Sequence, residues 1–340
     1  MVSLKDIAGR CGVSIATVSK ALNDQKDIGE ETRKKIKRIA AEMGYSPNSA
    51  ARVLKTKRSY NLGILFQDDA HRGLTHEYFS GVLQGIKEEA ERLGYDLTFI
   101  NTYSEHKRMS YLEHCRSRNF EGVVVVCVDF NHPEVQQLLN NTHIPVVTID
   151  YLHQNCSAVS SNNVKGMEEL IQYIYDKGHR KIAYIHGQKF SYVTRERLAS
   201  FYQMMDRLGI EVPEGYVKEA EYLETEGTAK YTRELLSMEE APTCILYPDD
   251  TSLIGGWNVI LEAGLRIPED ISIAGYDGSK VSQLLHPKLT TIRQKTEEIG
   301  KQAAIHLIRK IEKPKTTLVT RVVIDGKLLN GQSVGSIPVS

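Results

Sequence analysis

The stretch GVSIATVSKALN, residues 12–23, combines a glycine turn with a short amphipathic helix. Ser14 stands where a hydroxyl can cap the start of a helix. Val18 and Ala21 follow at the spacing of a single helical face, which predicts that they point into a core. Side chains on the other face, Lys20 among them, are therefore expected to point outward and to need a partner.

Two further helices are predicted around this stretch. Ser3 and Asp6 have the three-residue spacing of a capping box, which predicts a helix start at residue 4. A third helix is predicted from about residue 30 to residue 43, where Gly44 ends it. A helix, a glycine turn and a second helix with polar residues at its start indicate a helix-turn-helix, whose second helix enters the major groove of DNA.

Charge is distributed unevenly along the chain. Residues 1–58 hold 13 Lys and Arg against 6 Asp and Glu, a net +7, although the whole chain holds 43 of each. The remaining residues hold 30 against 37, a net −7. A basic N-terminal head on an acidic body indicates that the head, and not the body, meets a polyanion.

From residue 61 the sequence alternates strand-like and helix-like segments. Apolar runs such as LGILF (62–66) and GVVVVCV (122–128) are separated by amphipathic stretches, and a second series includes KIAYIHG (181–187) and ISIAGYDG (271–278). This alternation is typical of parallel sheets that are buried on both faces. Two such series predict two α/β lobes with a small-molecule site between them.

Several classes of protein are excluded by what the sequence lacks. Its five cysteines are scattered without Cys-x-x-Cys spacing, so we expect neither a disulfide framework nor a metal site. No signal peptide is recognisable, and no apolar run approaches the roughly 18 residues of a membrane span. The motifs of common hydrolases, phosphate loops and metalloproteases are also missing. We therefore expect a cytoplasmic protein that is not an enzyme, has no catalytic residues and needs no cofactor.

The N-terminal motifs resemble one known family. LKDIAGRCGVSIATVSKALN (4–23), followed by ETRKKIKRIAAEMGYSPNSAARVLK (31–55), resembles the lactose-repressor and galactose-repressor (LacI/GalR) family of transcription regulators. The resemblance is dense over residues 1–56 and continues more loosely to about residue 325. It implies an all-α helix-turn-helix head, joined by a hinge helix to a two-lobed α/β core with parallel sheets like that of periplasmic binding proteins.

The resemblance also implies domain boundaries. The helix-turn-helix head takes residues 1–46, the hinge helix and linker 47–60, and the effector-binding core 61–340. Within the core we expect an N-lobe of about 61–161 and 293–322, and a C-lobe of about 162–292 and 323–340.

The same resemblance indicates which residues contact DNA. In the family the start of the second helix sets operator choice, which here implicates Ile15 and Ala16 on thymine methyl groups and Lys20 on guanine. Thr17 and Ser19 are expected to hold phosphates. Partial packing of Ile15 and Ala16, and a solvated Lys20, are the alternatives. The full expected set is Ser14, Ile15, Ala16, Thr17, Ser19, Lys20, Asn23, Tyr45, Asn48, Ala51 and Leu54.

The segment after Pro47 resembles the hinge helix of the family, which folds only on DNA and pairs with its twofold mate. Leu54 takes the place of the leucine that enters the minor groove and kinks the duplex, unless it is a simple linker leucine. Two such helices in one groove imply a homodimer on a nearly palindromic double-stranded operator. The C-terminal stretch lacks the heptad leucines of a tetramerising tail, which favours a dimer.

Effector contacts are implied by motifs that follow core strands or open core helices. VTRERLASF places Arg197 at the effector-clamping arginine of the family, AGYDG places Asp277 at its acidic contact, and TIDY places Asp150 at a strand end. The usual Asn-Asp pair is replaced here by Asp249 and Asp250. This departure changes the expected hydrogen bonds, because an ionised carboxylate only accepts whereas an amide also donates.

The expected effector is a carbohydrate, because ionised groups pair with hydroxyls and aromatic rings lie on apolar sugar faces. Alternatives remain for single residues: core packing for each ring, an interlobe salt bridge for Arg197 and a helix cap for Asp277. The predicted function is a sequence-specific repressor whose operator affinity changes when the sugar binds between the lobes. Control by a protein co-effector or by a purine-like corepressor is the alternative. The full expected effector set is Tyr78, Phe79, Asp150, Phe190, Arg197, Trp257, Asp249 and Asp277.

Overall fold

The chain forms two compact units, a head of residues 1–59 and a core of residues 60–340. The computed structural model describes residues 2–25, 27–45, 53, 58–67, 73–104, 107–141 and 143–338. Three of the expected DNA contacts, Asn48, Ala51 and Leu54, lie outside the described residues.

The head is built from three helices around a small apolar core. They are α1 (Leu4–Cys11), α2 (Ile15–Leu22) and α3 (Glu30–Glu42). The Ser3 hydroxyl accepts the N–H of Asp6 at 3.3 Å, and the Asp6 carboxylate accepts the N–H of Ser3 at 2.8 Å. This confirms the predicted capping box. Gly12 follows α1 with a φ of 73°, in the left-handed region that favours glycine, and so makes the turn into α2.

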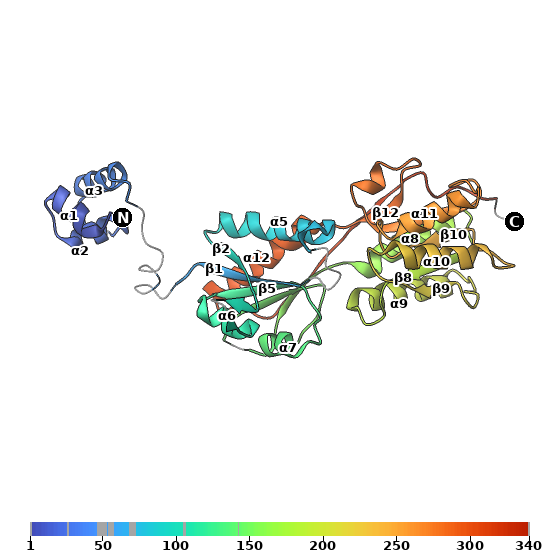
Figure 1. The fold of residues 1–340 in the computed structure, drawn as a ribbon, viewed down its shortest axis with the longest axis horizontal. Coiled ribbons are helices and arrows are strands. Elements are labelled where there is room, and N and C mark those ends of the chain that lie inside the picture. Colours follow the sequence, from blue (N-terminus) through green and yellow to red (C-terminus); the bar gives the residue numbers. More distant parts are fainter. Residues whose placement is uncertain are drawn as a thin grey trace. The chain divides into compact units, whose positions relative to one another are not determined.

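The N-lobe of the core is a parallel sheet covered by helices on both faces (Figure 1). Its strand order is β13-β7-β6-β5-β1-β2. The strands are β1 (Asn61–Phe66), β2 (Asp96–Phe99), β5 (Gly122–Cys127), β6 (Val146–Ile149), β7 (Ser157–Ser161) and β13 (Arg321–Ile324). The other elements are η1 (Gly73–Thr75), α5 (Glu77–Arg92), the hairpin β3 (Tyr103–Ser104) and β4 (Lys107–Arg108), α6 (Tyr111–Ser117), α7 (Pro133–Leu139) and α12 (Thr296–Glu312).

Strand β5 shows why its sequence is an unbroken apolar run. Val124 and Val126 pack in one cluster with residues of α5 and α12, whereas Val123 and Val125 pack in another with residues of α6 and α7. Successive side chains of a strand point to opposite faces, so both faces of β5 must be apolar. The predicted burial of the sheet on both faces is confirmed.

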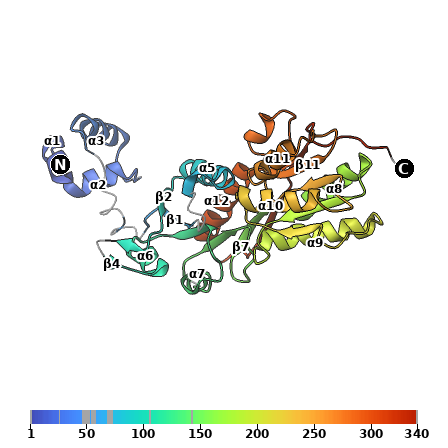
Figure 2. The same ribbon diagram turned by 45° about the vertical axis from the view of Figure 1, so that its right-hand side comes forward.

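Helices α5 and α12 lie side by side although they come from opposite ends of the core sequence (Figures 1 and 2). Gly85 and Gly300 lie at their contact. A Cβ atom at Gly85 would fall 2.0 Å from the carbonyl oxygen of Glu297, and one at Gly300 would fall 2.0 Å from that of Val82. Only glycine therefore allows this close approach of the two helix backbones.

The C-lobe repeats this architecture. Its strand order is β14-β12-β11-β10-β8-β9, with every pairing parallel except that of β14 with β12. The strands are β8 (Ile182–His186), β9 (Val217–Glu219), β10 (Cys244–Leu246), β11 (Ser272–Asp277), β12 (Thr290–Arg293) and β14 (Lys327–Leu329). The helices are α8 (Asn163–Asp176), α9 (Tyr192–Arg207), α10 (Thr225–Leu236), α11 (Leu253–Glu262) and η2 (Val281–Gln283). Residues of α8 and α9 pack on one face and residues of α10 and α11 on the other, which confirms the predicted pair of α/β lobes.

The chain passes between the lobes after β7, after β12 and after β13. The second passage follows Arg293 and the third follows Ile324. On the third crossover, Asp325 accepts hydrogen bonds from the Asn162 side chain at 2.8 Å and from Lys165 at 2.5 Å. Both partners lie at the first crossover, so one carboxylate ties two crossovers together. None of the described helices is long and apolar enough to cross a bilayer.

Candidate functional site

Helix α2 of the head presents the side chains at its start to the surface. The Ser14 hydroxyl accepts the N–H of Thr17 at 3.1 Å and shares a hydrogen bond with its hydroxyl at 2.8 Å. Ile15 is 48% exposed and Ala16 is also exposed, whereas Val18 on the opposite face is fully buried. A capped helix thus holds two apolar side chains in solvent, where they can contact the methyl groups of thymine.

The polar residues of α2 already have partners within the head. Lys20 forms an ion pair with Asp27 at 2.5 Å, and both side chains are about half exposed. Such an exposed pair adds little stability, so Lys20 can exchange Asp27 for an acceptor on a base. The Asn23 side chain donates to the carbonyl of Ser19 at 2.6 Å. The ring of Tyr45 is half-buried against the apolar core of the head.

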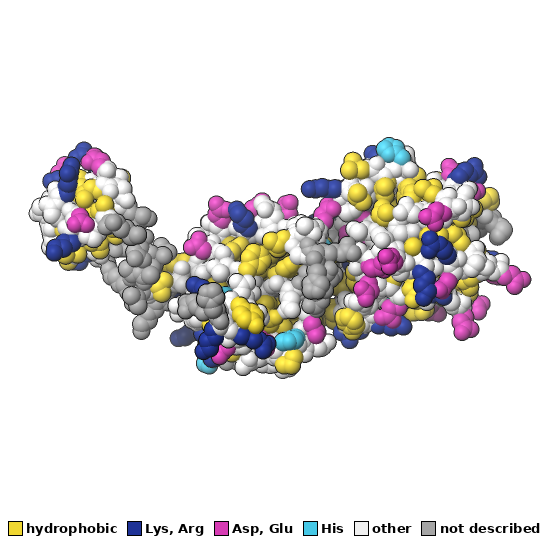
Figure 3. All heavy atoms as spheres, viewed as in Figure 1, with side chains coloured by type: hydrophobic (Ala, Val, Ile, Leu, Met, Phe, Trp, Pro, Cys, Tyr) yellow, Lys and Arg dark blue, Asp and Glu magenta, His cyan; other side chains and the backbone are white. Residues whose placement is uncertain are grey.

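The distribution of surface charge separates the head from the core. Lys34, Lys35 and Arg38 are exposed on α3, in the unit that carries the net positive charge. Figure 3 shows acidic and basic side chains interspersed over the visible face of the C-lobe. Phosphates are attracted by clustered positive charge, so the head is the candidate nucleic-acid-binding unit.

A second group of functional side chains gathers in the core where the two lobes meet. Asp150 follows β6 of the N-lobe, whereas Arg197 lies on α9 and Asp277 ends β11 in the C-lobe. Burial raises the pKa of both carboxyl groups, and the positive charge of Arg197 opposes that rise in each case. The three charges therefore interact across the lobe boundary. We call Asp150, Arg197 and Asp277 the interlobe cluster.

Asp150 is held by residues of its own lobe. The Tyr78 hydroxyl donates to one oxygen of its carboxylate, and the backbone N–H of Ser161 donates to the other at 3.2 Å. Asp150 has a φ of 54°, in the left-handed region that residues other than glycine rarely adopt. Such backbone conformations are often found at functional sites. Burial and the neighbouring carboxylate raise the pKa of Tyr78, so its hydroxyl remains a donor.

Arg197 is 3% exposed, yet its hydrogen-bonding capacity is only partly used. Its Nε donates to the Asn163 side chain at 2.9 Å and its Nη1 donates to the carbonyl of Pro248 at 3.2 Å. The guanidinium carbon lies 3.5 Å from the ring centroid of Tyr276. Within the part of the chain that is described, no carboxylate lies within ion-pair distance of Arg197, and Nη2 has no protein partner. The interlobe salt bridge is thus not formed, and one end of the guanidinium is available to a ligand.

Asp277 is oriented by the second crossover. Gln294, the first residue after β12, donates from its side chain to one Asp277 oxygen at 2.6 Å. Asp277 does not cap the following turn, because the N–H of Ser282 donates to the Ser279 hydroxyl instead. The lobes also touch directly nearby, where the N–H of Lys280 donates to the Glu77 carboxylate at 2.9 Å. A change at Asp277 can therefore reach the joint between the lobes.

Asp249 and Asp250 accept hydrogen bonds from the loops around them. The carboxylate of Asp249 accepts the N–H of Thr251 at 2.9 Å, that of Ser252 at 2.8 Å, that of Leu223 at 2.9 Å and the Ser252 hydroxyl at 2.5 Å. A carboxylate has about four lone-pair positions, and all are used here. Asp250 accepts the Thr291 hydroxyl and the N–H of Ser279, both at 2.7 Å. Asp249 thus holds its own loop in place, and the expected effector contact at Asp249 stays a prediction.

The expected aromatic rings separate into three environments. Tyr78 is buried beside Asp150, and Phe79 is half-buried next to it, with 5.1 Å between ring centroids. Phe190 is 71% exposed. Trp257 is 7% exposed and packs in the apolar cluster between the C-lobe sheet and helices α10 and α11. This side of α11 faces the lobe interior, and the expected effector contact at Trp257 stays a prediction.

Sequence reasoning missed other residues around the cluster. Tyr222 is half-buried, its hydroxyl shares a hydrogen bond with that of Thr194 at 2.8 Å, and Arg197 influences its pKa. Phe130 and Tyr151 stack in parallel with 3.9 Å between their centroids. Tyr151 directly follows Asp150, the predicted strand end, which is a signal that sequence reasoning could have used. Tyr222 lies in a loop and has no such signal.

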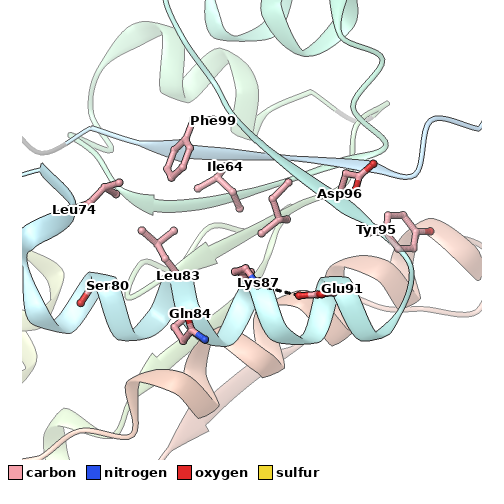
Figure 4. A pocket seen from close by; sticks show the side chains of 11 residues that line it. Ile64, Leu74, Ser80, Leu83, Gln84, Lys87, Glu91, Tyr95, Asp96 and Phe99 are labelled. Carbon is pink, nitrogen blue, oxygen red and sulfur yellow. Dashed lines mark hydrogen bonds and ion pairs between the residues drawn. The ribbon is translucent and has the colours of Figure 1, made fainter. Parts of the chain in front are cut away.

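A groove of about 610 Å³ lies elsewhere on the N-lobe, between α5 and β2 (Figure 4). Leu74 and Phe99 on its wall are 54% and 43% exposed. Its most prominent polar feature is the ion pair of Lys87 with Glu91 at 2.9 Å. None of the residues that line it belongs to the interlobe cluster. An apolar surface of this kind is typical of a protein contact rather than of a sugar site.

The head and the interlobe cluster together define a class of protein in which a DNA-binding head is attached to a ligand-binding core. Residues 3–48 match the model of bacterial regulatory proteins of the lacI family, and residues 171–334 match that of periplasmic binding protein-like domains. The chain thus joins a head that matches the lacI family of bacterial regulatory proteins to a core that matches periplasmic binding protein-like domains. The predicted family and fold class are confirmed.

Repressors are among its relatives. The ribose operon repressor of Escherichia coli K12 is 29% identical over 317 residues, which cover 92% of this chain and 94% of that protein. The transcriptional repressor PurR of Pasteurella multocida is 29% identical, with 92% of each chain covered. The crystal structure of the Lac repressor dimer bound to operator and an anti-inducer matches with a TM-score of 0.81 and 24% identity, over 98% of this chain and 99% of that chain. This last similarity supports the fold.

Proposed function

We propose that this protein is a transcriptional repressor whose affinity for its operator changes when a small neutral carbohydrate binds at the interlobe cluster. The observation that carries the proposal is the meeting of Asp150 from one lobe with Arg197 and Asp277 from the other. The ribose operon repressor among its relatives supports a sugar as effector. The protein is then a regulator and not an enzyme, and it acts in the cytoplasm, where it meets DNA.

The chemistry of the cluster favours a polyhydroxylated ligand. Each sugar hydroxyl both donates and accepts, so neighbouring hydroxyls match a carboxylate acceptor beside a guanidinium donor. Two carboxylates face a single cation, so a phosphate or carboxylate group on the ligand is repelled. A ligand that contacts both lobes changes the equilibrium between their arrangements, and operator affinity changes with it by linkage.

The proposed operator complex is a homodimer on a nearly palindromic DNA site, with Ile15, Ala16 and Lys20 on the bases. The groove between α5 and β2 is the surface that we assign to the partner subunit. This assignment is supported by the exposed side chains of Leu74 and Phe99, which a second copy of the chain would bury.

A purine-like corepressor is the second candidate, and PurR among the relatives supports it. The half-buried ring of Tyr222 can stack on a base. A protein co-effector fits less well, because Arg197 is buried and a protein surface cannot reach it. A sugar, a purine and a protein co-effector therefore need different chemical groups at the interlobe cluster.

The test is isothermal calorimetry of the full chain with ribose, glucose, galactose, cellobiose, adenosine and hypoxanthine, together with operator binding to DNA obtained by selection in vitro. We expect a sugar to bind and to change operator affinity. Arg197→Ala should weaken that binding about 100-fold, because it removes a buried charged donor. Arg195→Ala, an exposed arginine on the same helix, is the matched control. Equal sugar affinity in wild type and Arg197→Ala contradicts the proposal.

A further inference from the structure

Ser161 has a buried hydroxyl without a partner. It is the last residue of β7, and the first crossover between the lobes starts directly after it. Its side chain is 2% exposed, and among the described residues its Oγ atom has no hydrogen-bond partner. A buried hydroxyl normally has a partner, because leaving it unpaired is unfavourable. An unpaired hydroxyl at this position therefore needs an explanation.

The hydroxyl lies on the N-lobe side of the interlobe cluster. The N–H of Ser161 donates to Asp150 at 3.2 Å, so the two residues are in direct contact. Successive side chains of a strand alternate between faces, so Ser161 shares a face with Val159. Val159 packs in the same apolar cluster as Tyr78, whose hydroxyl holds the other Asp150 oxygen. Ser161 thus continues the polar wall that Tyr78 and Asp150 begin.

Two other buried hydroxyls lack partners among the described residues, and they differ in position. The ring of Tyr276 stacks under Arg197, so its hydroxyl belongs to the surroundings of the cluster on the C-lobe side. Thr290 is paired in register with Ala274, three positions along β11 from Asp277, a separation of about 10 Å. Thr290 is therefore an unpaired buried hydroxyl away from the cluster, and it provides a control for Ser161.

We infer that Ser161 is a specificity-determining residue of the effector site and that its hydroxyl hydrogen-bonds a hydroxyl of the bound carbohydrate. The inference rests on the proposed function. Asp150 accepts from one ligand hydroxyl and Ser161 pairs with a neighbouring one, so the effector carries hydroxyls on adjacent carbons at its N-lobe end. A ligand with a hydrogen in place of either hydroxyl leaves a buried polar group unpaired and is discriminated against.

The test compares Ser161→Ala with Thr290→Val in the full chain. The probes are the sugar of the calorimetric panel that binds wild type and its monodeoxy analogues. Ser161→Ala should weaken binding of the parent sugar about 5- to 10-fold, the effect of one hydrogen bond, whereas Thr290→Val should not. For one deoxy analogue the wild type and Ser161→Ala should bind equally, because the interaction is absent from both.

Thermal unfolding without ligand distinguishes a ligand contact from a structural role. Because Ser161 loses no hydrogen bond, the Tm of Ser161→Ala should equal or exceed that of wild type. A clear fall in Tm, or unchanged affinity for the parent sugar while Arg197→Ala abolishes it, overturns the inference and leaves the proposed function standing. If wild type binds no sugar of the panel, the proposed function fails and the inference fails with it.

Discussion

The head and the core carry their functional side chains in opposite surroundings. In the head, Ile15 is exposed on a capped helix, so it contributes little to the fold and is free to contact a partner. In the core, Arg197 and Asp249 are both almost fully buried, and burial alone does not tell a ligand contact from a structural residue. Their hydrogen bonds do: Arg197 keeps an unused donor, whereas every acceptor position of Asp249 is filled. Buried polar residues should therefore be assigned by their unused hydrogen-bonding capacity.

The strongest test of this contrast is Trp257→Ala. Trp257 packs in the apolar core of the C-lobe, so its truncation should lower the free energy of unfolding by about 3–5 kcal/mol. Urea denaturation measures the loss, and calorimetry should find the effector affinity of the remaining folded protein unchanged. Phe190→Ala, at a ring that is 71% exposed, should leave the free energy of unfolding nearly unaltered. A variant of Trp257 with normal stability and lost effector binding would assign this ring to the effector site.

In the head, Lys20→Ala should weaken binding and leave stability unchanged, the reverse of Trp257→Ala. We expect a loss of about 1–3 kcal/mol in operator binding, confined to one base pair in each half-site, because Lys20 reads a guanine. The free energy of unfolding should hardly change, since the pair with Asp27 is exposed. Fluorescence anisotropy with singly substituted operators measures the effect, and Lys34→Ala on α3 is the control. A uniform loss on all operator sequences would make Lys20 a phosphate contact instead.

The smallest expected effect is a pH dependence of effector binding. Burial raises the pKa of Asp150 and Asp277 above the ordinary carboxyl value of 3.8, so both protonate earlier as the pH falls from neutral toward that value. Protonation weakens their hydrogen bonds to sugar hydroxyls, so effector affinity should fall over this range. The same raised pKa has the reverse effect on folding, because the folded state takes up these protons before the unfolded one and gains stability.

Calorimetry of wild type and Asp150→Asn over the same pH series measures this dependence. The asparagine variant should bind the sugar more weakly at neutral pH and should show a flatter pH profile. Operator binding through Ile15 and Ala16 should not follow the carboxyl titration, since neither side chain ionises. Identical profiles for both proteins would remove Asp150 from the effector site.

Local signals in the sequence predicted a large part of the fold. Ser3 with Asp6, and Ser14 before α2, specify helix starts through atoms three residues away. The valine run of β5 predicted a strand that is buried on both faces. These helix starts and this strand depend on residues that are close in the sequence, so the sequence alone predicts them.

The candidate site was predicted less completely, because its chemistry depends on distant partners. One acceptor position of the Asp249 carboxylate is occupied by the N–H of Leu223, which lies in a separate loop. Trp257 lies in the first half of α11, a position that fits either a ligand or a core contact, and its packing depends on residues distant in the sequence. The hydroxyl of Ser161 is defined by the lack of a hydrogen-bond partner among the described residues, which no local pattern encodes. The family resemblance indicated Arg197 and Asp277 as effector contacts, but it did not predict the residues that surround them.

The three crossovers also restrict how such a protein can be rebuilt by recombination. Because the chain returns to each lobe, neither lobe is encoded by one uninterrupted gene segment, and a single exchange of DNA cannot replace one lobe alone. The head, in contrast, is one contiguous segment that ends before residue 60. A new operator can thus be acquired by one crossover event in the gene, whereas a new effector must come from substitutions within the core or from inheritance of the whole core.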